Sequence, residues 1–595
     1  HGSMLLYSLL HLFGYGNLSK EDLMNFRQLD SKTPGHPEYG HTVGVEATTG
    51  PLGAGMGMAV GMAMAEAHLE SVFNKENYPV VDHYTYVLGG DGCMMEGISS
   101  EAFSLAGTLG LSKLIVLYDS NRISIEGSTD IAFRENVQER MQAFGFQTIT
   151  VEDGNDIDAI GKAIEAAKAD TEHPSFITIK TQIGFGCPAK QGKASAHGEP
   201  LGVENVEALR KNLNWPSEEP FFVPEEVYKN YSEIAEQKAE VEAAWNVMFA
   251  AYCEEYPEME ALWNQYHNAK AGEALKDDAG FWAKQEKPEA SRAISGRLIN
   301  YIKDVLPNLF GGSADLAPSN KTNMKDAGDF SKEDRAGRNL HFGVRELAMA
   351  AIGNGIMLHG GLRAYVSTFF VFSDYCKPMA RLSALMGVPL TYVFTHDSIG
   401  VGEDGPTHEP IEQMAALRAM PNFHVFRPCD ATETEAAWYS AVTSEHTPTA
   451  LVLTRQNLEP MAGSSREALK GGYIIDDCEG TPELILIASG SEVALAVHAK
   501  ETLAAEGQKV RVVSMPCMDL FEEQSEEYKE SVLPREVRRR VAVEALGSFG
   551  WDKYTGLDGK IIAMERFGAS APAGLLFKKF GFTVEHVVEV AKSLK

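Results

Sequence analysis

The sequence has few cysteines, a shortage of positive charge and no long apolar run. Its seven cysteines lie among 595 residues without any Cys-x-x-Cys spacing. This pattern is typical of free thiols in a reducing compartment, and not of a disulfide framework or a zinc site. The formal net charge of −30 argues against nucleic acid or an anionic membrane as the main partner. An anionic substrate would therefore need a local basic pocket.

The lack of a long apolar run argues against a membrane-spanning helix. The most apolar stretch is residues 50–69, "GPLGAGMGMAVGMAMAEAHL", which we interpret as a glycine loop leading into a helix buried on most sides. We therefore expect no membrane contact and a cytoplasmic location. The first residue is His1 and not Met, so the sequence is compatible with a targeting segment before it.

Three blocks of the chain alternate short β-rich runs with helical patterns, which predicts three doubly wound α/β domains. We expect the first domain at 1–215, a charged helical linker at 216–290, a second domain at 291–460 and a smaller C-terminal domain at 461–595. Apolar residues make up 44% of the chain, enough to form a core in each. The expected strands lie at 84–90, 114–120, 175–181, 364–369, 389–395, 449–455, 483–490, 510–515 and 560–568, and the first helices at 100–110 and 157–169.

A glycine-rich turn, "GGDGCMMEG" (89–97), follows the first expected strand. Such turns often cradle a phosphate, because bare backbone N–H groups can approach the anion. Asp91 would repel a phosphate directly, but Asn121 follows the next strand, and ligands bind where neighbouring strands end. Asp91 and Asn121 could therefore share Mg²⁺ or Ca²⁺, which also takes phosphate oxygens. An ordinary tight turn with Asn121 as a cap explains the local pattern equally well.

Longer motifs decide between these interpretations. Together they resemble the transketolase family of thiamine diphosphate enzymes, over essentially the whole chain. The resemblance implies a diphosphate-binding domain that lacks its N-terminal part, then a pyrimidine-binding domain and a C-terminal domain. The motifs are "SKTPGHPE" (31–38), "TTGPLG" (48–53), "GDGCMMEGIS" (90–99), "GSADLAPSN" (312–320), "GVREL" (343–347), "THDSIGVGEDGPTHEP" (395–410) and "RPCDATE" (427–433).

The resemblance implies a reversible transfer of a two-carbon ketol unit within the pentose phosphate pathway. The donor would be a ketose phosphate such as xylulose 5-phosphate, and the acceptor an aldose phosphate such as ribose 5-phosphate or erythrose 4-phosphate. Breaking a carbon–carbon bond beside a carbonyl leaves an electron pair that needs a sink. Thiamine diphosphate supplies that sink, and the protein supplies binding and orientation.

The same resemblance implies how the cofactor is held. Mg²⁺, or Ca²⁺ or Mn²⁺ in its place, would be bound by Asp91, Asn121 and the backbone carbonyl of Ile123. Glu346 would hold the proton that activates the pyrimidine ring, although without the resemblance it would be taken for a surface helix residue. The residues expected to contact the cofactor are His1, Gly50, Leu52, Gly92, Asn121, Asp315, Glu346, Phe369, Phe372 and Tyr375.

The three aromatic residues Phe369, Phe372 and Tyr375 have a second interpretation. Their spacing of three residues predicts one face of a helix, packed in the core by default. In the family these positions form the aromatic wall around the pyrimidine, and we adopt that interpretation.

Substrate binding is assigned to residues in loop-like segments. His36, His197 and His408 would act on the reacting hydroxyl and carbonyl groups as catalytic residues, because neutral imidazole is an acid and a base near pH 7. Asp404 would accept a hydrogen bond from a substrate hydroxyl, although a turn aspartate explains it equally. Arginine suits a phosphate because its planar fork binds two oxygens. The phosphate group of the substrate would be held by Arg292, Ser319, His396 and Arg455.

The resemblance also implies a homodimer with each active site at the subunit interface. Asp91 and Glu346 would then serve one cofactor from different chains, with Glu96 and Glu101 near the interface or simply exposed. The family pattern begins before His1, so we expect a histidine-bearing loop of the family to be missing. Two alternatives therefore stay open, a dihydroxyacetone synthase and a non-catalytic transketolase-like protein. The phosphate residues and "GEDGPTHEP" argue against a deoxyxylulose phosphate synthase.

Overall fold

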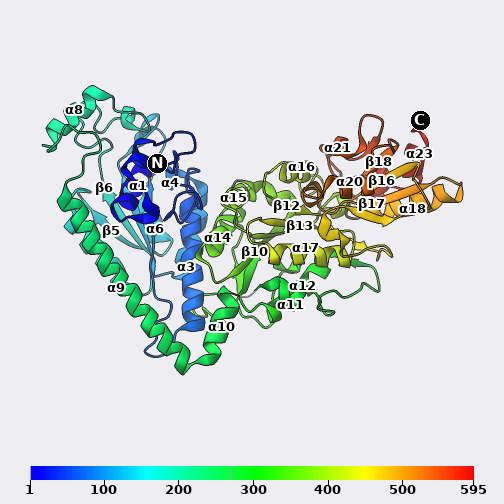
Figure 1. The fold of residues 1–595 in the computed structure, drawn as a ribbon, viewed down its shortest axis with the longest axis horizontal. Helices are drawn as coiled ribbons and strands as arrows, with labels where there is room; N and C mark the ends of the chain where they lie inside the picture. The colour runs from blue at the N-terminus through cyan, green and yellow to red at the C-terminus, as the bar shows by residue number, and fades with distance from the viewer. Residues whose placement is uncertain (1, 269, 595) are drawn as a thin grey trace. The chain divides into compact units, whose positions relative to one another are not determined.

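The computed structural model describes residues 2–268 and 270–594 and shows a mixed α/β chain (Figure 1). The chain forms two compact units. The first contains the residues up to 264 together with 330–337 and 354–361, and the second contains the others. Among the described residues, no helix is both long enough and apolar enough to cross a membrane.

The first unit is built on a four-stranded parallel sheet in the order β1-β2-β6-β5. The three strands expected in this part are confirmed as β1 (Thr85–Gly90), β2 (Leu114–Ser120) and β6 (Ser175–Lys180), and β5 spans Gln147–Val151. The expected helices are α5 (Gly97–Leu109) and α7 (Ile157–Ala169). The strands are parallel, so all four end at the same edge of the sheet.

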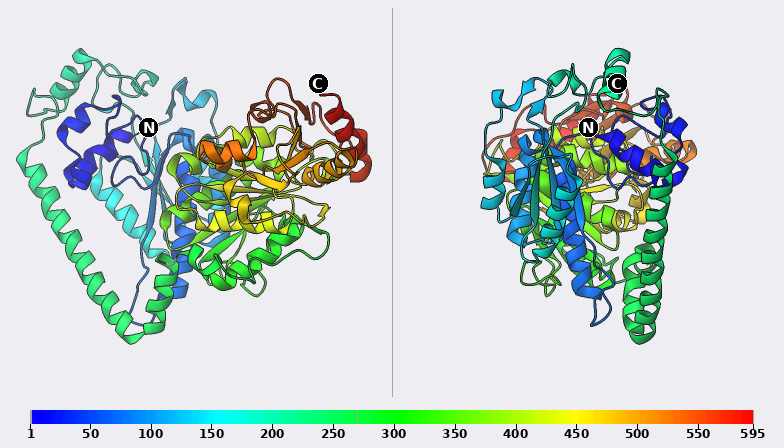
Figure 2. Two further views of the ribbon diagram at one scale, coloured as in Figure 1. Left: turned by 45° about the vertical axis from the view of Figure 1, so that its right-hand side comes forward. Right: turned by 90° about the vertical axis from the view of Figure 1, so that its left-hand side faces the viewer.

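The glycine-rich apolar stretch forms helix α3 (Ala54–Phe73), which has 14 buried residues among its 20. It packs beside β1 and α5, and so it is a core helix, as expected. Helix α9 (Glu225–Glu255) is instead almost entirely accessible to solvent, because Tyr252 is its one buried residue. Figure 2 shows α9 running along the outside of the first unit. It lies within the predicted helical linker, whose limits stay a prediction.

The second unit contains two sheets. The larger is entirely parallel, in the order β12-β13-β11-β10-β8-β9, and confirms the expected strands as β10, β11 and β13. Its members are β8 (Leu309–Ser313), β9 (Asn339–His341), β10 (Arg363–Phe369), β11 (Thr391–Thr395), β12 (His424–Phe426) and β13 (Thr449–Leu453).

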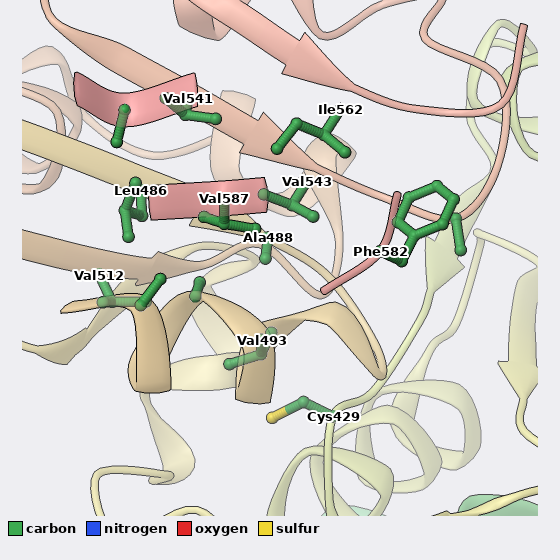
Figure 3. Close-up of a cluster of buried hydrophobic side chains, with 14 of the residues drawn as sticks. Cys429, Leu486, Ala488, Val493, Val512, Val541, Val543, Ile562, Phe582 and Val587 are labelled. Carbon is green, nitrogen blue, oxygen red and sulfur yellow. The ribbon is translucent and has the colours of Figure 1, made fainter. Parts of the chain in front are cut away.

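The smaller sheet has the order β15-β17-β16-β18-β19, with β15 antiparallel and the other four strands parallel. Its apolar core includes Leu486, Val512 and Val541, which pack with Val493 and Val587 of two helices (Figure 3). The strands are β15 (Tyr473–Asp476), β16 (Leu484–Ala488), β17 (Val510–Ser514), β18 (Arg540–Val543) and β19 (Lys560–Ile562), and the two helices are α18 (Glu492–Ala505) and α23 (Val584–Lys592).

The other elements are further helices, short strands and 3₁₀ turns. Two two-stranded sheets pair β3 with β4 and β7 with β14. The elements are α1 (Ser3–Leu12), η1 (Tyr15–Asn17), α2 (Lys20–Met24), α4 (Asp91–Met95), β3 (Ile123–Ser124), β4 (Gly127–Ser128), η2 (Thr129–Ile131), α6 (Val137–Ala143), η3 (Ala194–Ala196), α8 (Val203–Asn212), α10 (Pro257–His267), α11 (Ala271–Leu275), β7 (Glu289–Ala290), α12 (Ser291–Val305), α13 (Ala317–Asn320), α14 (Glu346–His359), η4 (Phe370–Phe372), α15 (Ser373–Met386), η5 (Ile399–Val401), α16 (Gln413–Arg418), α17 (Ala431–Thr443), β14 (Asn457–Leu458), η6 (Arg466–Lys470), α19 (Met518–Glu522), α20 (Glu526–Val532), α21 (Asp552–Thr555) and α22 (Ala573–Lys579).

Candidate active site

Asp91 and Asn121 lie at neighbouring strand ends, as their positions in the sequence predicted. Asp91 follows β1 and Asn121 follows β2, and the two strands pair in parallel with Gly90 opposite Asp119. The Asp91 carboxylate is buried, with 4% of its surface exposed. Its Oδ1 accepts a hydrogen bond from the Tyr118 hydroxyl at 2.5 Å, and its Oδ2 accepts one from the Arg122 backbone N–H at 2.9 Å. The carboxylate is therefore held in one orientation.

The turn after β2 carries the other two expected cation ligands, Asn121 and the Ile123 carbonyl, and it contacts Asp91. The Asn121 side-chain oxygen accepts a hydrogen bond from the Ile123 N–H at 2.9 Å. Arg122, between them, has a left-handed backbone with φ of 61°, and this turn directs its N–H to Asp91. Backbone N–H groups of this turn therefore donate to the side-chain oxygens of both Asp91 and Asn121.

The chemistry of these donors fits a hard divalent cation. Burial raises the pKa of Asp91, and hydrogen bonds from Tyr118 and Arg122 oppose the shift. A cation beside the carboxylate would favour its ionised form. No cluster of three or more His, Cys, Asp or Glu residues suited to a metal occurs in the part of the chain that the structure describes. A cation held by Asp91 and Asn121 would therefore need further oxygens, such as those of a diphosphate.

The glycine loops predicted to contact the cofactor lie close to other predicted site residues. A Cβ on Gly92 would lie 2.8 Å from Leu52 Cδ1, and a Cβ on Gly50 would lie 3.3 Å from His36 Cγ. Gly50 also has φ of 133°, which an L side chain rarely adopts. His36 is half-buried, and its pKa is lowered by burial first and by nearby Arg27. Its imidazole is therefore neutral near pH 7.

Four other predicted residues of the first unit are placed less closely, or not at all. His197 is half-buried on a separate loop directly after η3. Glu96 is exposed between α4 and α5, and Glu101 lies half-buried on α5. His1 lies outside the described residues.

In the second unit, three of the four predicted phosphate-binding residues meet. Arg292 stands at the start of α12, and its Nη1 donates to the backbone oxygen of Ser319 at 2.9 Å. The same nitrogen lies 3.3 Å from Nε2 of His396. The fourth residue, Arg455, donates to the Val401 backbone oxygen at 2.9 Å. The helix start, α13 and the loop after β11 thus bring Arg292, Ser319 and His396 together.

His396 is held as a neutral imidazole. It is buried, and its pKa falls to about 3 because of burial first and then the positive charges of Arg292 and Arg455. Since its Nε2 faces an arginine donor, its Nδ1 carries the proton and donates to Thr395 Oγ1 at 2.7 Å. Thr395 in turn donates to the side-chain oxygen of Asn320 at 2.7 Å. This chain of hydrogen bonds fixes the ring.

The prediction that Phe369, Phe372 and Tyr375 line one helical face is wrong. Phe369 ends strand β10, Phe372 ends the 3₁₀ turn η4, and Tyr375 lies in α15. Strand β10 pairs with β11 up to Phe369 opposite Thr395, so sheet hydrogen bonds keep the chain extended where the spacing favoured a helix. Tyr375 is 62% exposed, so it is not a core residue either.

The three rings nevertheless form one aromatic row. The centroids of Phe369 and Phe372 are 6.0 Å apart, and those of Phe372 and Tyr375 are also 6.0 Å apart. The His408 ring stands edge-on to Phe372, with centroids 5.4 Å apart. The His396 ring lies 3.9 Å from Phe369, between centroids. The row therefore connects the two predicted histidines of the second unit.

Glu346 lies beside the same row. It is the first residue of α14 and is half-buried. Thr368 Oγ1, just before the aromatic row, donates to Glu346 Oε1 at 3.4 Å. Asp315 and Asp404 are both exposed, on the loops after β8 and η5.

Sequence reasoning missed the residues that orient these groups. Tyr118 fixes Asp91, and Asn320 and Thr395 fix His396. Tyr118 precedes Asn121 by three residues on a strand, so its position near the sheet edge was available as a signal. Asn320 acts on a residue 75 positions away, and only the folded chain shows that contact.

Comparison with known proteins identifies the family of the chain. Three family models match in order along the chain: the transketolase thiamine diphosphate binding domain at 1–271, the transketolase pyrimidine binding domain at 287–461 and a transketolase-like C-terminal domain at 471–583. The chain belongs to the transketolase family. It is therefore a thiamine diphosphate-dependent enzyme, and the predicted family, cofactor and three-domain α/β fold are confirmed.

Named transketolases resemble the chain over its whole length. A transketolase of Halalkalibacterium halodurans is 54% identical over 600 residues, which cover 100% of this chain and 89% of the relative. The transketolase structure from Leishmania mexicana aligns with a TM-score of 0.95 at 46% identity, over 100% of this chain and 88% of that one. A Pichia stipitis transketolase in complex with sedoheptulose-7-phosphate aligns with a TM-score of 0.94 at 45% identity, over 99% and 87%.

Proposed function

We propose that this transketolase transfers a two-carbon ketol unit from xylulose 5-phosphate to ribose 5-phosphate or erythrose 4-phosphate. The observation that carries the proposal is the Asp91–Asn121 pair at the strand ends, because such an oxygen set suits a cation bound to a diphosphate. The Arg292–His396 cluster adds a place for a sugar phosphate. A relative's complex with sedoheptulose-7-phosphate supports the substrate class.

The divalent ion would be Mg²⁺, with Ca²⁺ or Mn²⁺ as substitutes. Asp91, the Asn121 side chain and the backbone carbonyl of Ile123 would hold it. Gly92 would approach the diphosphate, and it packs so closely against Leu52 that a Cβ would lie 2.8 Å from Leu52 Cδ1. Gly50 and Leu52 would contact the rings of the cofactor. These roles explain why a buried carboxylate is tolerated at Asp91.

Glu346 would hold the proton beside the pyrimidine nitrogen. Phe369, Phe372 and Tyr375 form the row against which the ring would stack, and Asp315 would contact the cofactor from the next loop. When bound, thiamine diphosphate supplies the electron sink for carbon–carbon cleavage. The protein would orient it through the aromatic row and Glu346.

Substrate binding would use two sets of residues. Arg292, Ser319, His396 and Arg455 would hold the phosphate. Because His396 is neutral and its Nδ1 hydrogen bond is already made, its Nε2 would face either Arg292 or the substrate. His36, His197 and His408 would exchange protons with the sugar hydroxyl and carbonyl groups. Asp404, which is exposed on its loop, would accept a hydrogen bond from a sugar hydroxyl.

We further propose that the active enzyme is a homodimer, with Asp91 of one chain and Glu346 of the other at each cofactor. Glu96 and Glu101 would lie near that interface. A cytoplasmic location agrees with the seven cysteines, all of which are free thiols.

The proposal is tested by turnover. The protein is mixed with thiamine diphosphate, Mg²⁺, xylulose 5-phosphate and ribose 5-phosphate, and sedoheptulose 7-phosphate is measured. We expect product, and we expect Glu346→Ala to lose it while Glu445→Ala, an exposed residue of the same unit, keeps it. Cofactor binding without turnover from any donor would contradict the proposal. A preference for formaldehyde over ribose 5-phosphate would favour a dihydroxyacetone synthase, an alternative that the high identity to named transketolases does not favour.

A further inference from the structure

The C-terminal sheet has a position where α/β domains commonly bind a ligand. Strand β16 is central, and the chain passes first to β17 on one side and then to β18 on the other. In such sheets, ligands bind outside the carboxyl ends of the strands where this reversal occurs. Here the reversal is lined by Ser489, Gly490 and Glu492 after β16, and by Glu544 after β18.

A side chain of the pyrimidine-binding domain fills this position. Arg427 follows β12, and its side chain is fully buried. Its Nη1 donates to the Ser489 backbone oxygen at 2.9 Å and to Glu492 Oε2 at 2.5 Å. The Gly490 N–H donates back to the Arg427 carbonyl at 3.0 Å. The two domains are therefore joined through both the side chain and the backbone of one arginine.

Gly490 is shaped for this contact. Its φ is 54°, and a Cβ at this residue would lie 2.7 Å from the Arg427 guanidinium carbon. Any side chain would push the guanidinium away, in a backbone region that favours glycine. The turn after β16 therefore fits Arg427 closely and leaves no room for another ligand there.

The other edge of the guanidinium reaches the proposed phosphate-binding cluster. Arg427 Nε donates to Asp397 Oδ2 at 3.0 Å, and Nη2 lies 2.8 Å from the same oxygen. Asp397 is 1% exposed and directly follows His396, whose φ of 65° is left-handed. Because such a backbone is strained for a residue other than glycine, the surrounding contacts must hold it. Arg427 supplies that hold through Asp397.

The buried charges around Arg427 form a connected network with those around Arg418. Arg418 donates two hydrogen bonds to Glu544, each of 2.8 Å, and Ser489 Oγ donates to Glu544 Oε1 at 2.5 Å. Burial raises the pKa of Glu492 even though Arg427 opposes the shift. Removing one member leaves a buried charge without its partner, which is costly. The arrangement therefore has little freedom to move.

A second contact holds the loop that carries Asp404 and His408. A Cβ on Gly405 would lie 2.1 Å from Ser570 Oγ, and a Cβ on Gly568 would lie 1.7 Å from Glu409 Oε2. This loop of the pyrimidine-binding domain is therefore seated directly on residues of the C-terminal domain. Apolar packing continues across the same junction, since Cys429 shares a core with Val493 of α18 (Figure 3).

We propose that the C-terminal domain positions the phosphate-binding residues, and that Arg427 is the positioning residue that connects the two. The domain uses the ligand position of its own sheet to hold Arg427, and through Asp397 it fixes the turn at His396. This inference rests on the proposed function, because it assigns the phosphate of the substrate to the His396 cluster.

The test compares two acceptors with and without a phosphate. Arg427→Met and the conservative Arg427→Lys are assayed as holoenzyme with ribose 5-phosphate and with glycolaldehyde. Arg511→Met is the matched control, because Arg511 is a buried arginine of the C-terminal domain paired with Asp477 through two contacts of 2.9 Å. Folding is checked by circular dichroism and by thermal unfolding.

We expect kcat/KM for ribose 5-phosphate to fall roughly tenfold to a hundredfold in Arg427→Met, mainly through KM, because a displaced binding group loses this much. The value for glycolaldehyde should fall much less, and Arg427→Lys should recover part of the loss. Arg511→Met should lower kcat/KM equally for both acceptors or leave both values unchanged. Glu492→Gln, which keeps the size of the side chain, provides the same comparison if Arg427→Met does not fold.

Equal losses for both acceptors in Arg427→Met and Glu492→Gln would overturn the proposal, since a purely structural role affects both alike. His396→Ala separates this result from a failure of the proposed function. If His396→Ala leaves the KM for ribose 5-phosphate unchanged, the phosphate assignment itself is wrong. If His396→Ala raises that KM and the Arg427 and Glu492 variants do not, only the positioning role is wrong.

Discussion

The site in the first unit and the site in the second unit are built in opposite ways. Asp91, Asn121 and Ile123 lie within 33 residues, and backbone N–H groups of the turn after β2 donate to the side-chain oxygens of Asp91 and Asn121. The second site takes Arg292, His396 and the aromatic row from separate segments, and the residue after His396, Asp397, pairs with the distant Arg427. The first site is therefore a local motif, and the second is a product of the whole unit. Substitutions should affect them differently.

The largest expected effect is on the first site. Asp91→Ala removes the one carboxylate of the proposed cation site, so Mg²⁺-dependent binding of thiamine diphosphate should fall by roughly two to three orders of magnitude, or about 3–4 kcal/mol. Because the motif is local, the fold of the unit should persist. Titration calorimetry with and without Mg²⁺ measures the binding, and circular dichroism checks the fold.

Asp153→Ala is the matched control for this experiment. Asp153 is an exposed aspartate of the same unit, and its carboxylate accepts hydrogen bonds from the backbone and the side chain of Asn155. The control variant should bind the cofactor as the unchanged protein does. Normal Mg²⁺-dependent binding by Asp91→Ala would show that the loop after β1 does not hold the cation.

The second effect is smaller and selective. Arg292→Met removes one of the cations of the proposed phosphate site, so the KM for ribose 5-phosphate should rise roughly tenfold to a hundredfold while kcat changes little. The KM for glycolaldehyde should stay nearly constant. Steady-state kinetics with both acceptors measures the difference.

Arg297→Met is the control on the same helix. Arg297 is exposed on α12 and pairs with Glu289 at 3.4 Å, and exposed pairs contribute about 0–1 kcal/mol. Its kinetics should match those of the unchanged protein. An equal rise in KM for both acceptors in Arg292→Met would argue against a phosphate site at the start of α12.

The smallest expected effect concerns the stability of the second unit. Glu435 is buried on α17, and burial raises its pKa to about 8, although the nearby Arg297 and Arg466 oppose the shift. Its unfolded value is near 4.5. Between these two values the unfolded chain loses the proton first, so the free energy of unfolding falls as the pH rises and levels off above about 8.

Glu435→Gln removes this ionisation and keeps the shape of the side chain. The variant should therefore gain stability over the unchanged protein as the pH rises from 5 to 8.5, by on the order of 1–3 kcal/mol. Thermal unfolding midpoints across that range measure the gain, with the exposed Glu445→Gln as control. A difference that does not change with pH would mean that Glu435 is ionised in the folded protein.

The same contrast explains what the sequence could predict. The strands at 84–90 and 114–120 are short apolar runs bounded by turn residues, so the sheet edge with Asp91 and Asn121 followed from local patterns. The three-domain α/β fold followed from the alternation of such runs. These features depend on residues close together in the chain, where periodicity and turn chemistry are informative.

The second site was predicted from the family resemblance and not from local rules. Local spacing placed Phe369, Phe372 and Tyr375 on a helix, but the pairing of β10 with β11 kept Phe369 in a strand. The neutral state of His396 comes from burial and from two arginines that are distant in sequence but near in space. The Arg427–Glu492 contact joins residues 65 positions apart. Tertiary contacts of this kind have no signature in a short window of sequence.

The central claim, that the two sites of different chains form one active site, is tested most directly by mixing two inactive variants. Asp91→Ala and Glu346→Ala are each purified, combined, dissociated and reassociated, and sedoheptulose 7-phosphate formation is measured. If each cofactor lies between Asp91 of one chain and Glu346 of the other, every mixed dimer has one intact site. Random reassociation should then restore about a quarter of the normal activity, since half of the dimers are mixed. No recovery from mixed dimers that demonstrably form would contradict the account, because both sites would then belong to one chain.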